Sequence, residues 1–294
     1  MWIGVTKRFS EFHRNLLLTQ DQHDDGLTKH RGVRGVLNRH YHGVSSETAN
    51  SFLVGSWAKH TRVRPPRDVD VYFELPQTVY SRYEDVRGNK QSALLQEVRN
   101  VLRATYPSTD IRGDGQVVMV AFNTISVEVA PVFRLVSGKY FFCDTHDGGS
   151  YKVADPEAEK RSIESIDANN NGNLRRLIRM VKTWQSHCSV PLKSFYIELV
   201  MSEFIQASEW RRNSYYYYDW LLRDFFDYLL SRRNGYLIVP GTHDVINLGS
   251  DWVSRCETAH ARAVRACEHE YFDNIDSAGE EWQKIFGAKI PKYL

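Results

Sequence analysis

The feature that most constrains the fold of this chain is an Asp-Val-Asp strand that follows a Gly-Ser turn. Polar and apolar residues alternate along residues 68–73, which read Asp-Val-Asp-Val-Tyr-Phe. Because an extended strand points successive side chains to opposite faces, Asp68 and Asp70 share one face and Val69 and Val71 share the other. Two carboxylates side by side in a poor solvent repel each other unless cations neutralise them. The pattern therefore predicts a strand that carries a divalent metal site.

Mg²⁺ is the natural cation for such a pair. It prefers hard oxygen ligands, usually takes one or two protein carboxylates, and fills its other positions with water and substrate phosphates. Upstream, the apolar residues 51–54 lead into Gly55 and Ser56. The missing Cβ of a glycine lets the backbone approach a phosphate, and a serine hydroxyl can bond to it. Taken separately, the two patterns also fit an ordinary turn and a solvated edge strand, but their order along the chain favours nucleotidyl transfer from a triphosphate.

A third carboxylate is expected downstream, and Glu128 is the best candidate. Within residues 125–131, Ile125, Val127 and Val129 form an apolar face while Glu128 points to the other. A charged residue in so apolar a segment is costly unless it is paired or binds a metal. The alternative is an edge-strand glutamate that faces water.

These residues resemble a known family, the bacterial cyclic-oligonucleotide synthases (CD-NTases of the SMODS type). That family is related to cyclic GMP-AMP synthase and oligoadenylate synthase within the DNA polymerase β-like nucleotidyltransferase superfamily. The motifs that carry the resemblance are residues 51–56, Thr61, Pro66, and residues 68–70, 127–131, 179–184, 192–195 and 282–287. They cover most of the chain. The third carboxylate of the family is usually Asp, so Glu128 is a departure that adds a methylene and could shift one metal.

The resemblance implies a lysine that holds the triphosphate, and this lysine maps onto Lys182. The helix expected over residues 174–186 carries Lys182 in a basic row with Arg175 and Arg179. A solvated helix face is the ordinary explanation for such a row. The resemblance favours a phosphate contact for Lys182.

The family resemblance also implies other nucleotide contacts. Ser194 would bind the triphosphate, Phe195 would stack on a nucleobase, and Gly55 and Ser56 would orient the phosphates. Ser194 opens an apolar-periodic run, so it would lie at a helix N-terminus, where free amides favour an anion. A plain helix cap is the alternative for Ser194, and core packing is the alternative for Phe195.

The resemblance also implies the cofactor, the product and the partners. Two Mg²⁺ ions, with Mn²⁺ as the alternative, would be held by Asp68, Asp70 and Glu128 and would promote the displacement of pyrophosphate by a ribose hydroxyl. The substrates would be nucleoside triphosphates, ATP among them, and the product a cyclic di- or trinucleotide second messenger of bacterial antiphage (CBASS) signalling. A regulatory partner protein of the HORMA type or the conjugating type, from the same operon, is implied. No membrane is involved, and nucleic acid is not required, although its binding stays open.

Two other functions stay open at this point. One is a nucleotidyltransferase that modifies RNA, a protein or a small molecule. The other is a nucleotide-binding or RNA-binding module that has lost catalysis. Such a module would be expected to have lost a metal carboxylate, so the presence of both Asp68 and Asp70 argues against it.

Composition agrees with a cytoplasmic enzyme. With 294 residues, 42% of them hydrophobic, the chain can bury a large core in one or two domains. The net charge of +2 does not indicate a protein that coats polyanions. The four cysteines show neither a C-x-x-C pair nor zinc-type spacing, so reduced thiols are expected. No apolar run approaches the ~20 residues of a membrane span, and the first residues lack a signal-peptide core.

The periodicities predict an α+β fold in two parts. Helical spacing occurs over residues 5–20 and 92–105, and short apolar segments near 51–54, 68–74, 116–122, 125–133 and 139–143 predict a mixed sheet with flanking helices. A polar stretch at 144–149 follows, and from about residue 158 the patterns are helical. With the resemblance, we predict a polymerase β-like nucleotidyltransferase core with an N-terminal helix at 1–150. A helical C-terminal lobe would occupy 151–294, with the active site in the cleft between them.

Overall fold

The computed structural model describes residues 3–294, which divide into two compact units. The sheet unit comprises residues 18–60 and 65–158, and the helical unit comprises residues 3–17, 61–64 and 159–294. The domain boundary expected between residues 150 and 151 stays a prediction. The contacts within the chain divide it into units at other positions. The first helix and the segment 61–64 belong to the helical unit. The chain therefore leaves the sheet unit and returns to it between the Gly-Ser turn and the Asp-x-Asp strand.

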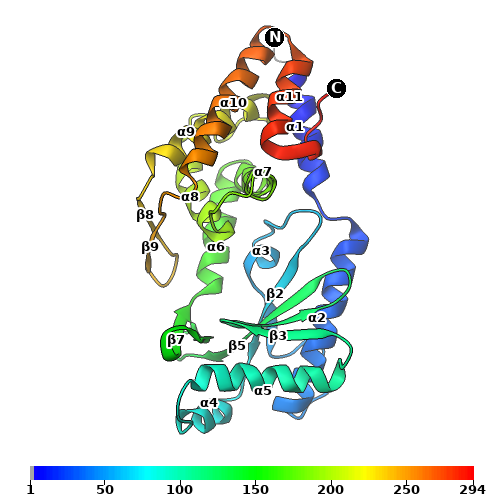
Figure 1. Ribbon diagram of the computed structural model, residues 1–294, viewed down its shortest axis with the longest axis vertical. Coiled ribbons are helices and arrows are strands. Elements are labelled where there is room, and N and C mark those ends of the chain that lie inside the picture. Colours follow the sequence, from blue (N-terminus) through cyan, green and yellow to red (C-terminus); the bar gives the residue numbers. More distant parts are fainter. Residues whose placement is uncertain (1–2) are drawn as a thin grey trace. The chain divides into compact units, whose positions relative to one another are not determined.

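A mixed seven-stranded sheet is the centre of the sheet unit (Figure 1). Its strands are β1 (Ser51–Leu53), β2 (Asp68–Glu74), β3 (Asp110–Asp114), β4 (Val117–Ala121), β5 (Ser126–Arg134), β6 (Tyr140–Asp144) and β7 (Ser150–Ala154). The order is β1-β2-β5-β4-β3, with β6 paired to β5 and β7 paired to β6. Strands β2 and β5 are parallel, and the other pairs are antiparallel. The predicted α+β class with a mixed sheet is confirmed.

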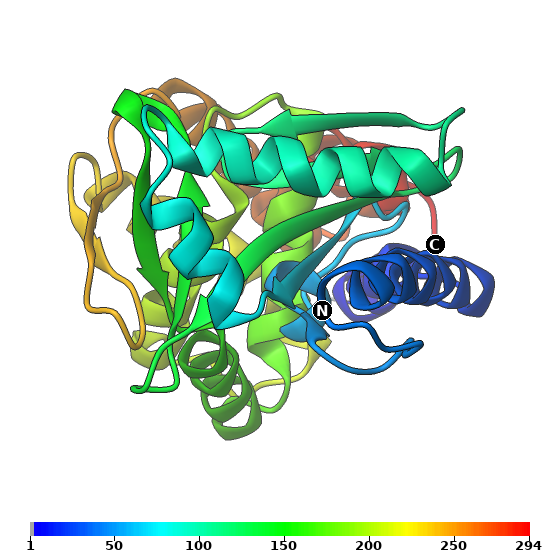
Figure 2. The same cartoon turned by 90° about the horizontal axis from the view of Figure 1, so that it is seen from below.

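Two long helices cover one face of this sheet. Helix α2 (Gln20–Tyr41) contacts β2 and β5, and α5 (Lys90–Thr105) contacts β3, β4 and β6. In Figure 2, α5 runs along the sheet with the short helix α4 (Gln77–Glu84) beside its beginning. Their apolar side chains share one core with the inward residues of the strands, among them Val36, Leu94, Val98, Val71 and Val127. Since side chains alternate along a strand, the polar residues of β2 and β5 lie on the opposite face.

The elements that the sequence patterns did not predict are polar or short. The helical spacing over 5–20 predicts one helix, but α1 ends at Leu16 and α2 begins at a capping box. Thr19 Oγ1 accepts from the amide of Gln22, and the Gln22 side chain accepts from the amide of Thr19. These bonds satisfy amides that only a helix start leaves free. Strand β3 lies at the sheet edge with only Ile111 buried, which leaves no alternating pattern.

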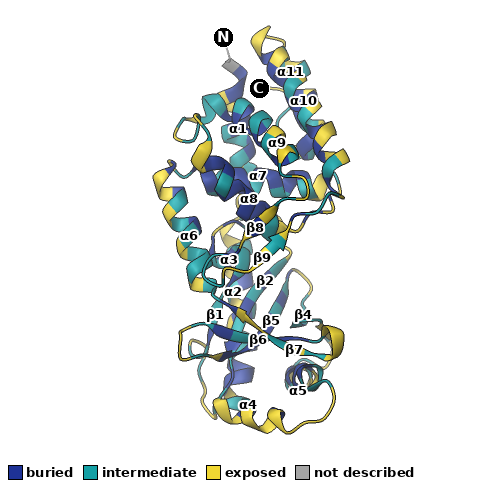
Figure 3. Ribbon diagram, turned by 90° about the vertical axis from the view of Figure 1, so that its left-hand side faces the viewer, coloured by how far each residue is buried: buried dark blue, intermediate teal, exposed yellow. Residues whose placement is uncertain are grey.

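The helical unit packs seven helices and a hairpin around one core. They are α1 (Ile3–Leu16), α6 (Pro156–Asn169), of which residues 159–169 belong to this unit, α7 (Asn173–His187), α8 (Ser194–Ala207), α9 (Tyr218–Ser231), α10 (Val253–Tyr271), α11 (Ile275–Phe286), and the strands β8 (Tyr236–Ile238) and β9 (Val245–Asn247). Figure 3 shows α7 and α8 largely in the colour of buried residues. Helix α7 corresponds to the helix expected over residues 174–186, and the apolar side chains on one of its faces are fully buried, namely Leu174, Leu177, Ile178, Val181 and Trp184.

Two expectations from composition concern the cysteines and membrane-spanning helices. All four cysteines are free thiols, three of them buried, as predicted. Among residues 3–294, no helix combines the length and the apolarity that crossing a bilayer requires.

Candidate active site

Three carboxylates lie on one face of the sheet unit, on two adjacent parallel strands. Asp70 of β2 stands opposite Glu128 of β5, and Asp68 stands opposite Ser126. All three acidic side chains are half-buried, whereas Val69 and Val71 between and beside them are buried on the other face. The predicted strand phases are therefore the observed ones. The structure places Asp68, Asp70 and Glu128 on one face, at the middle of the sheet.

The Gly-Ser turn is pressed against this carboxylate face. Gly55 has a φ of +55°, and a Cβ built on it would lie 2.4 Å from Oδ2 of Asp70. Any side chain here would have to displace the Asp70 carboxylate, so the position favours glycine for both its backbone conformation and its space. The amide of Val54 donates to the carbonyl of Asp70 at 3.0 Å, which fixes β1 beside β2. Ser56 follows Gly55 in the short helix α3 (Gly55–Ala58).

A buried tryptophan that the motif did not identify fixes the other end of the turn. Trp57 Nε1 donates to the carbonyl oxygen of Asp68 at 2.6 Å, and its side chain is almost fully buried. Gly26 of α2 makes room for this ring, because a Cβ there would lie 2.5 Å from it. The turn is thus held to β2 at Asp70 and at Asp68. No short motif marks Gly26, since it is far from Trp57 in the sequence.

Electrostatics make the carboxylate face a place for a cation. Burial raises the pKa of Glu128, and the negative charges of Asp68 and then Asp114 raise it further. A bound divalent cation would offset both the burial and the repulsion, so this donor set fits Mg²⁺. Within residues 3–294, no three His, Cys, Asp or Glu side chains are already gathered as ligands of one ion.

The predicted nucleotide contacts of the helical unit lie along the seam between α7 and α8. Lys182 Nζ donates to Glu198 Oε1 at 2.6 Å, and Ser194 Oγ donates to Gln185 Oε1 at 2.9 Å. Lys182 and Gln185 are three residues apart on α7, and Ser194 and Glu198 are four apart on α8, so each pair shares a helix face. The structure therefore brings Lys182 and Ser194 onto one seam, and the sequence motifs did not identify Glu198 or Gln185.

The structure contradicts two of the simpler alternatives. Ser194 is not a helix cap, because Lys193 is the N-cap residue of α8 and makes no side-chain cap bond. Lys182 is not on a solvated face, because its side chain is only 10% exposed. Phe195 is half-buried and packs against the core of the helical unit. Its base-stacking role stays a prediction beside that packing.

Basic side chains next to the seam create a positive region within the helical unit. Burial lowers the pKa of Arg179 to about 10, and the neighbouring charge of Arg62 adds to the effect. Burial, with the charges of Arg179 and Arg176, lowers the pKa of His13 to about 4. Positive charges that lower the pKa of a neighbouring basic group favour an anion nearby.

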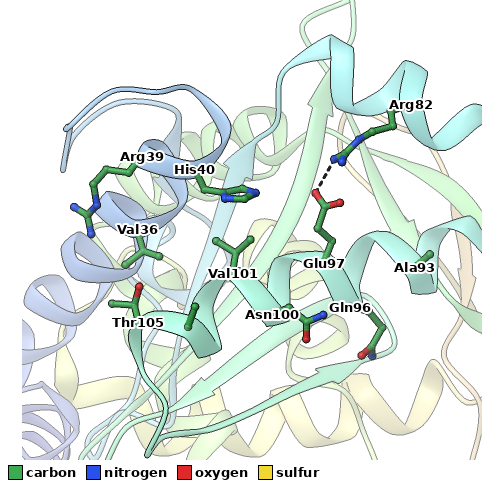
Figure 4. A pocket seen from close by; sticks show the side chains of 11 residues that line it. Val36, Arg39, His40, Arg82, Ala93, Gln96, Glu97, Asn100, Val101 and Thr105 are labelled. Atoms are coloured by element: carbon green, nitrogen blue, oxygen red, sulfur yellow. Dashed lines mark hydrogen bonds and ion pairs between the residues drawn. The ribbon is translucent and has the colours of Figure 1, made fainter.

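A groove on the helix-covered side of the sheet unit includes none of the predicted site residues. Side chains of α2 and α5 line it, with Arg39 and His40 on α2 and Glu97 on α5, and Arg82 pairs with Glu97 at 2.7 Å (Figure 4). These helices cover the face of the sheet opposite Asp70 and Glu128. We therefore assign no part of the nucleotide site to this groove.

A mixed sheet with paired carboxylates beside a Gly-Ser turn, followed by a helical unit, is the architecture of a nucleotidyltransferase. Solved structures of two proteins share this fold. Vibrio cholerae DncV in its apo form superposes with a TM-score of 0.71 at 12% identity, covering 96% of each chain. Escherichia coli CdnC with ATP gives a TM-score of 0.70 at 17% identity, covering 99% of this chain and 100% of that one.

The sequence comparisons identify the family. Residues 3–167 match the Second Messenger Oligonucleotide or Dinucleotide Synthetase (SMODS) domain, and the chain belongs to this family. A probable cyclic nucleotide synthase of Bacillus cereus is 22% identical over 278 residues, 81% of each protein. The CBASS oligonucleotide cyclase CdnC of Escherichia coli is 27% identical over 161 residues, 52% of this chain and 50% of that protein. The predicted family, and with it the synthesis of a cyclic oligonucleotide second messenger, is confirmed, whereas the individual site residues stay predictions.

Proposed function

We propose that this chain is a Mg²⁺-dependent synthase that joins nucleoside triphosphates into a cyclic di- or trinucleotide, with Asp68, Asp70 and Glu128 as its catalytic carboxylates. The observation that carries the proposal is the shared face of the three side chains. Asp70 stands opposite Glu128 and directly against Gly55, where no Cβ fits. A purely structural turn would not need its backbone in contact with a carboxylate.

Asp68, Asp70 and Glu128 would hold two Mg²⁺ ions. When bound, such ions stabilise the charge on the attacking and leaving oxygens of an in-line displacement at the α-phosphorus. Glu128 would have a second role, because a carboxylate beside the attacking hydroxyl can act as a general base. A carboxylate oxygen of Glu128 would accept the proton of the ribose hydroxyl. That hydroxyl oxygen forms a bond to the α-phosphorus while the bond to the pyrophosphate oxygen breaks.

The remaining site residues would bind and orient the nucleotide. Gly55 and Ser56 would place a backbone amide and a hydroxyl against the phosphates, and Lys182 and Ser194 would add a charge and a second hydroxyl. Phe195 would contact the base. The positive region around Arg179 in the helical unit supports an anionic ligand at Lys182. Holding both reactants in this way lowers the entropic cost of the reaction.

We further infer that ATP is among the substrates and that a HORMA-type protein regulates the enzyme. A solved structure of Escherichia coli CdnC contains ATP, and another is a complex of CdnC with a HORMA protein. The free cysteines agree with a location in the cytoplasm.

Incubation with the four radiolabelled nucleoside triphosphates and Mg²⁺ tests the proposal. After phosphatase treatment, a labelled product without free phosphate ends should remain, and mass spectrometry should show a cyclic oligonucleotide. The matched control is Asp68→Asn with Asp70→Asn, which keeps the shape of both side chains and should abolish the product. Label transferred to added RNA, to protein or to a small molecule instead would overturn the cyclic product. Full activity of the double variant would overturn the catalytic assignment.

A further inference from the structure

A closed hydrogen-bonded triangle surrounds Lys182 inside the helical unit. Lys182 Nζ donates to Glu198 Oε1 at 2.6 Å and to Thr61 Oγ1 at 3.1 Å. The Thr61 hydroxyl in turn donates to the same Glu198 oxygen at 2.5 Å. The Glu198 side chain is 3% exposed and Thr61 is fully buried. The triangle joins three segments, namely α7, α8 and residues 61–64.

The donor count of Lys182 shows what the triangle leaves available. An ammonium group has three N–H donors, and two of them point to Glu198 and Thr61. Among the contacts of residues 3–294, the third N–H of Lys182 has no partner. The two bonds fix the direction of the third, because the three donors are tetrahedrally arranged. A phosphate oxygen could therefore bind Lys182 without breaking either existing bond.

Charge explains why a carboxylate, Glu198, lies beside the lysine that would bind a phosphate. Burying an ammonium group without a counter-charge is energetically costly. Glu198 supplies that counter-charge at 2.6 Å. It also immobilises a long flexible side chain before the nucleotide arrives, so less conformational entropy is lost on binding.

We propose that Glu198 is a positioning residue that holds the Lys182 ammonium in place and aimed at a phosphate of the nucleoside triphosphate, with Thr61 as the second support. The inference rests on the proposed function, since it takes Lys182 as a phosphate ligand. It adds Glu198, which no motif marks, and it gives a role to Thr61, which belongs to the motifs but had none assigned. Thr61 lies in the segment between the Gly-Ser turn and β2, so the same triangle also anchors that segment, together with the bond from the Arg64 amide to the Leu16 carbonyl at 2.9 Å.

A double-mutant cycle on binding tests the proposal. Its variants are Lys182→Met, Glu198→Gln and the two combined, with Lys182→Met chosen because it preserves the aliphatic volume. The probe is the α,β-methylene analogue of whichever nucleoside triphosphate the wild type incorporates, and its Kd is measured by calorimetry. Glu198→Gln should raise the Kd about tenfold. In the Lys182→Met background, Glu198→Gln should raise the Kd hardly any further, because the two residues act as one unit.

The matched control is Glu203→Gln on the same helix. Glu203 also forms an ion pair, with Arg232 at 3.0 Å, but its side chain is 38% exposed and lies outside the triangle. The Kd of the Glu203→Gln variant for the same analogue should equal that of the wild type. In steady-state assays Glu198→Gln should raise KM and leave kcat within about twofold, which a general loss of folded protein would not do.

A second pair of variants covers the case in which Glu198→Gln does not fold. Thr61→Val removes the hydroxyl at nearly constant volume and should weaken binding, whereas Thr61→Ser keeps the hydroxyl and should bind as the wild type does. If the wild type incorporates no nucleotide, the proposed function fails. If it incorporates nucleotide and Glu198→Gln binds the probe with unchanged Kd, or if the losses in the cycle add, only this inference is overturned.

Discussion

Replacing Gly55 with alanine should separate the catalytic role of the Gly-Ser turn from its conformational role. Two costs can be worked out from the structure. A φ of +55° is strained for an L-residue, by about 1–2 kcal/mol. The new Cβ would also lie 2.4 Å from Asp70 Oδ2, so the carboxylate must move by roughly 1 Å to reach ordinary contact. A displacement of that size at a reacting centre costs about 100-fold in rate.

Gly43→Ala is the matched control for this prediction. Gly43 has a φ of +65°, but nothing lies within 4 Å of a Cβ built on it. Both variants should lose about 1–2 kcal/mol of stability, measured by urea unfolding. Only Gly55→Ala should lose about 100-fold in nucleotide incorporation at saturating Mg²⁺ and nucleotide. If both variants keep the same turnover, Asp70 is not a residue whose position limits the reaction.

The remaining predictions concern single side chains. Glu128→Gln should remove turnover with little change in nucleotide affinity, because its carboxylate acts on the attacking hydroxyl; full turnover would place the third ligand elsewhere. Lys182→Ala should weaken triphosphate binding by about 1.5–3 kcal/mol in calorimetry, and unchanged affinity would reduce Lys182 to a structural role. Asp219→Asn should alter how the free energy of unfolding depends on pH. Burial raises the pKa of Asp219 to about 7 from 3.8, so the folded state binds more protons and stability falls as pH rises from about 4 to 7. In urea unfolding, the variant should lose this decrease of stability between pH 4 and 7 and should be more stable than the wild type at pH 8, by at most about 4 kcal/mol. An unchanged pH dependence would contradict the raised pKa of Asp219.

The sequence determined the strand phases of the site because a strand is a local structure with a period of two. Alternation alone placed Asp68 and Asp70 on one face and Glu128 on the polar face of its own strand. The buried stripe of α7 followed equally from a period of 3.6. The family resemblance added Lys182 and Ser194, which the structure places on one seam. None of this required knowledge of contacts between distant residues.

Only the tertiary structure decided which partners those residues have. That Asp70 stands opposite Glu128 depends on a parallel register across 58 positions of the chain, and no local pattern encodes such a pairing. The Trp57 ring packs against Gly26 because glycine has no Cβ, which would otherwise lie too close to the ring. Glu198 lies in an apolar helix and has the sequence character of an unexplained charge. Its role is visible only where α7 and residues 61–64 bring Lys182 and Thr61 to its carboxylate, because burial permits such a charge only where its partners are already in place.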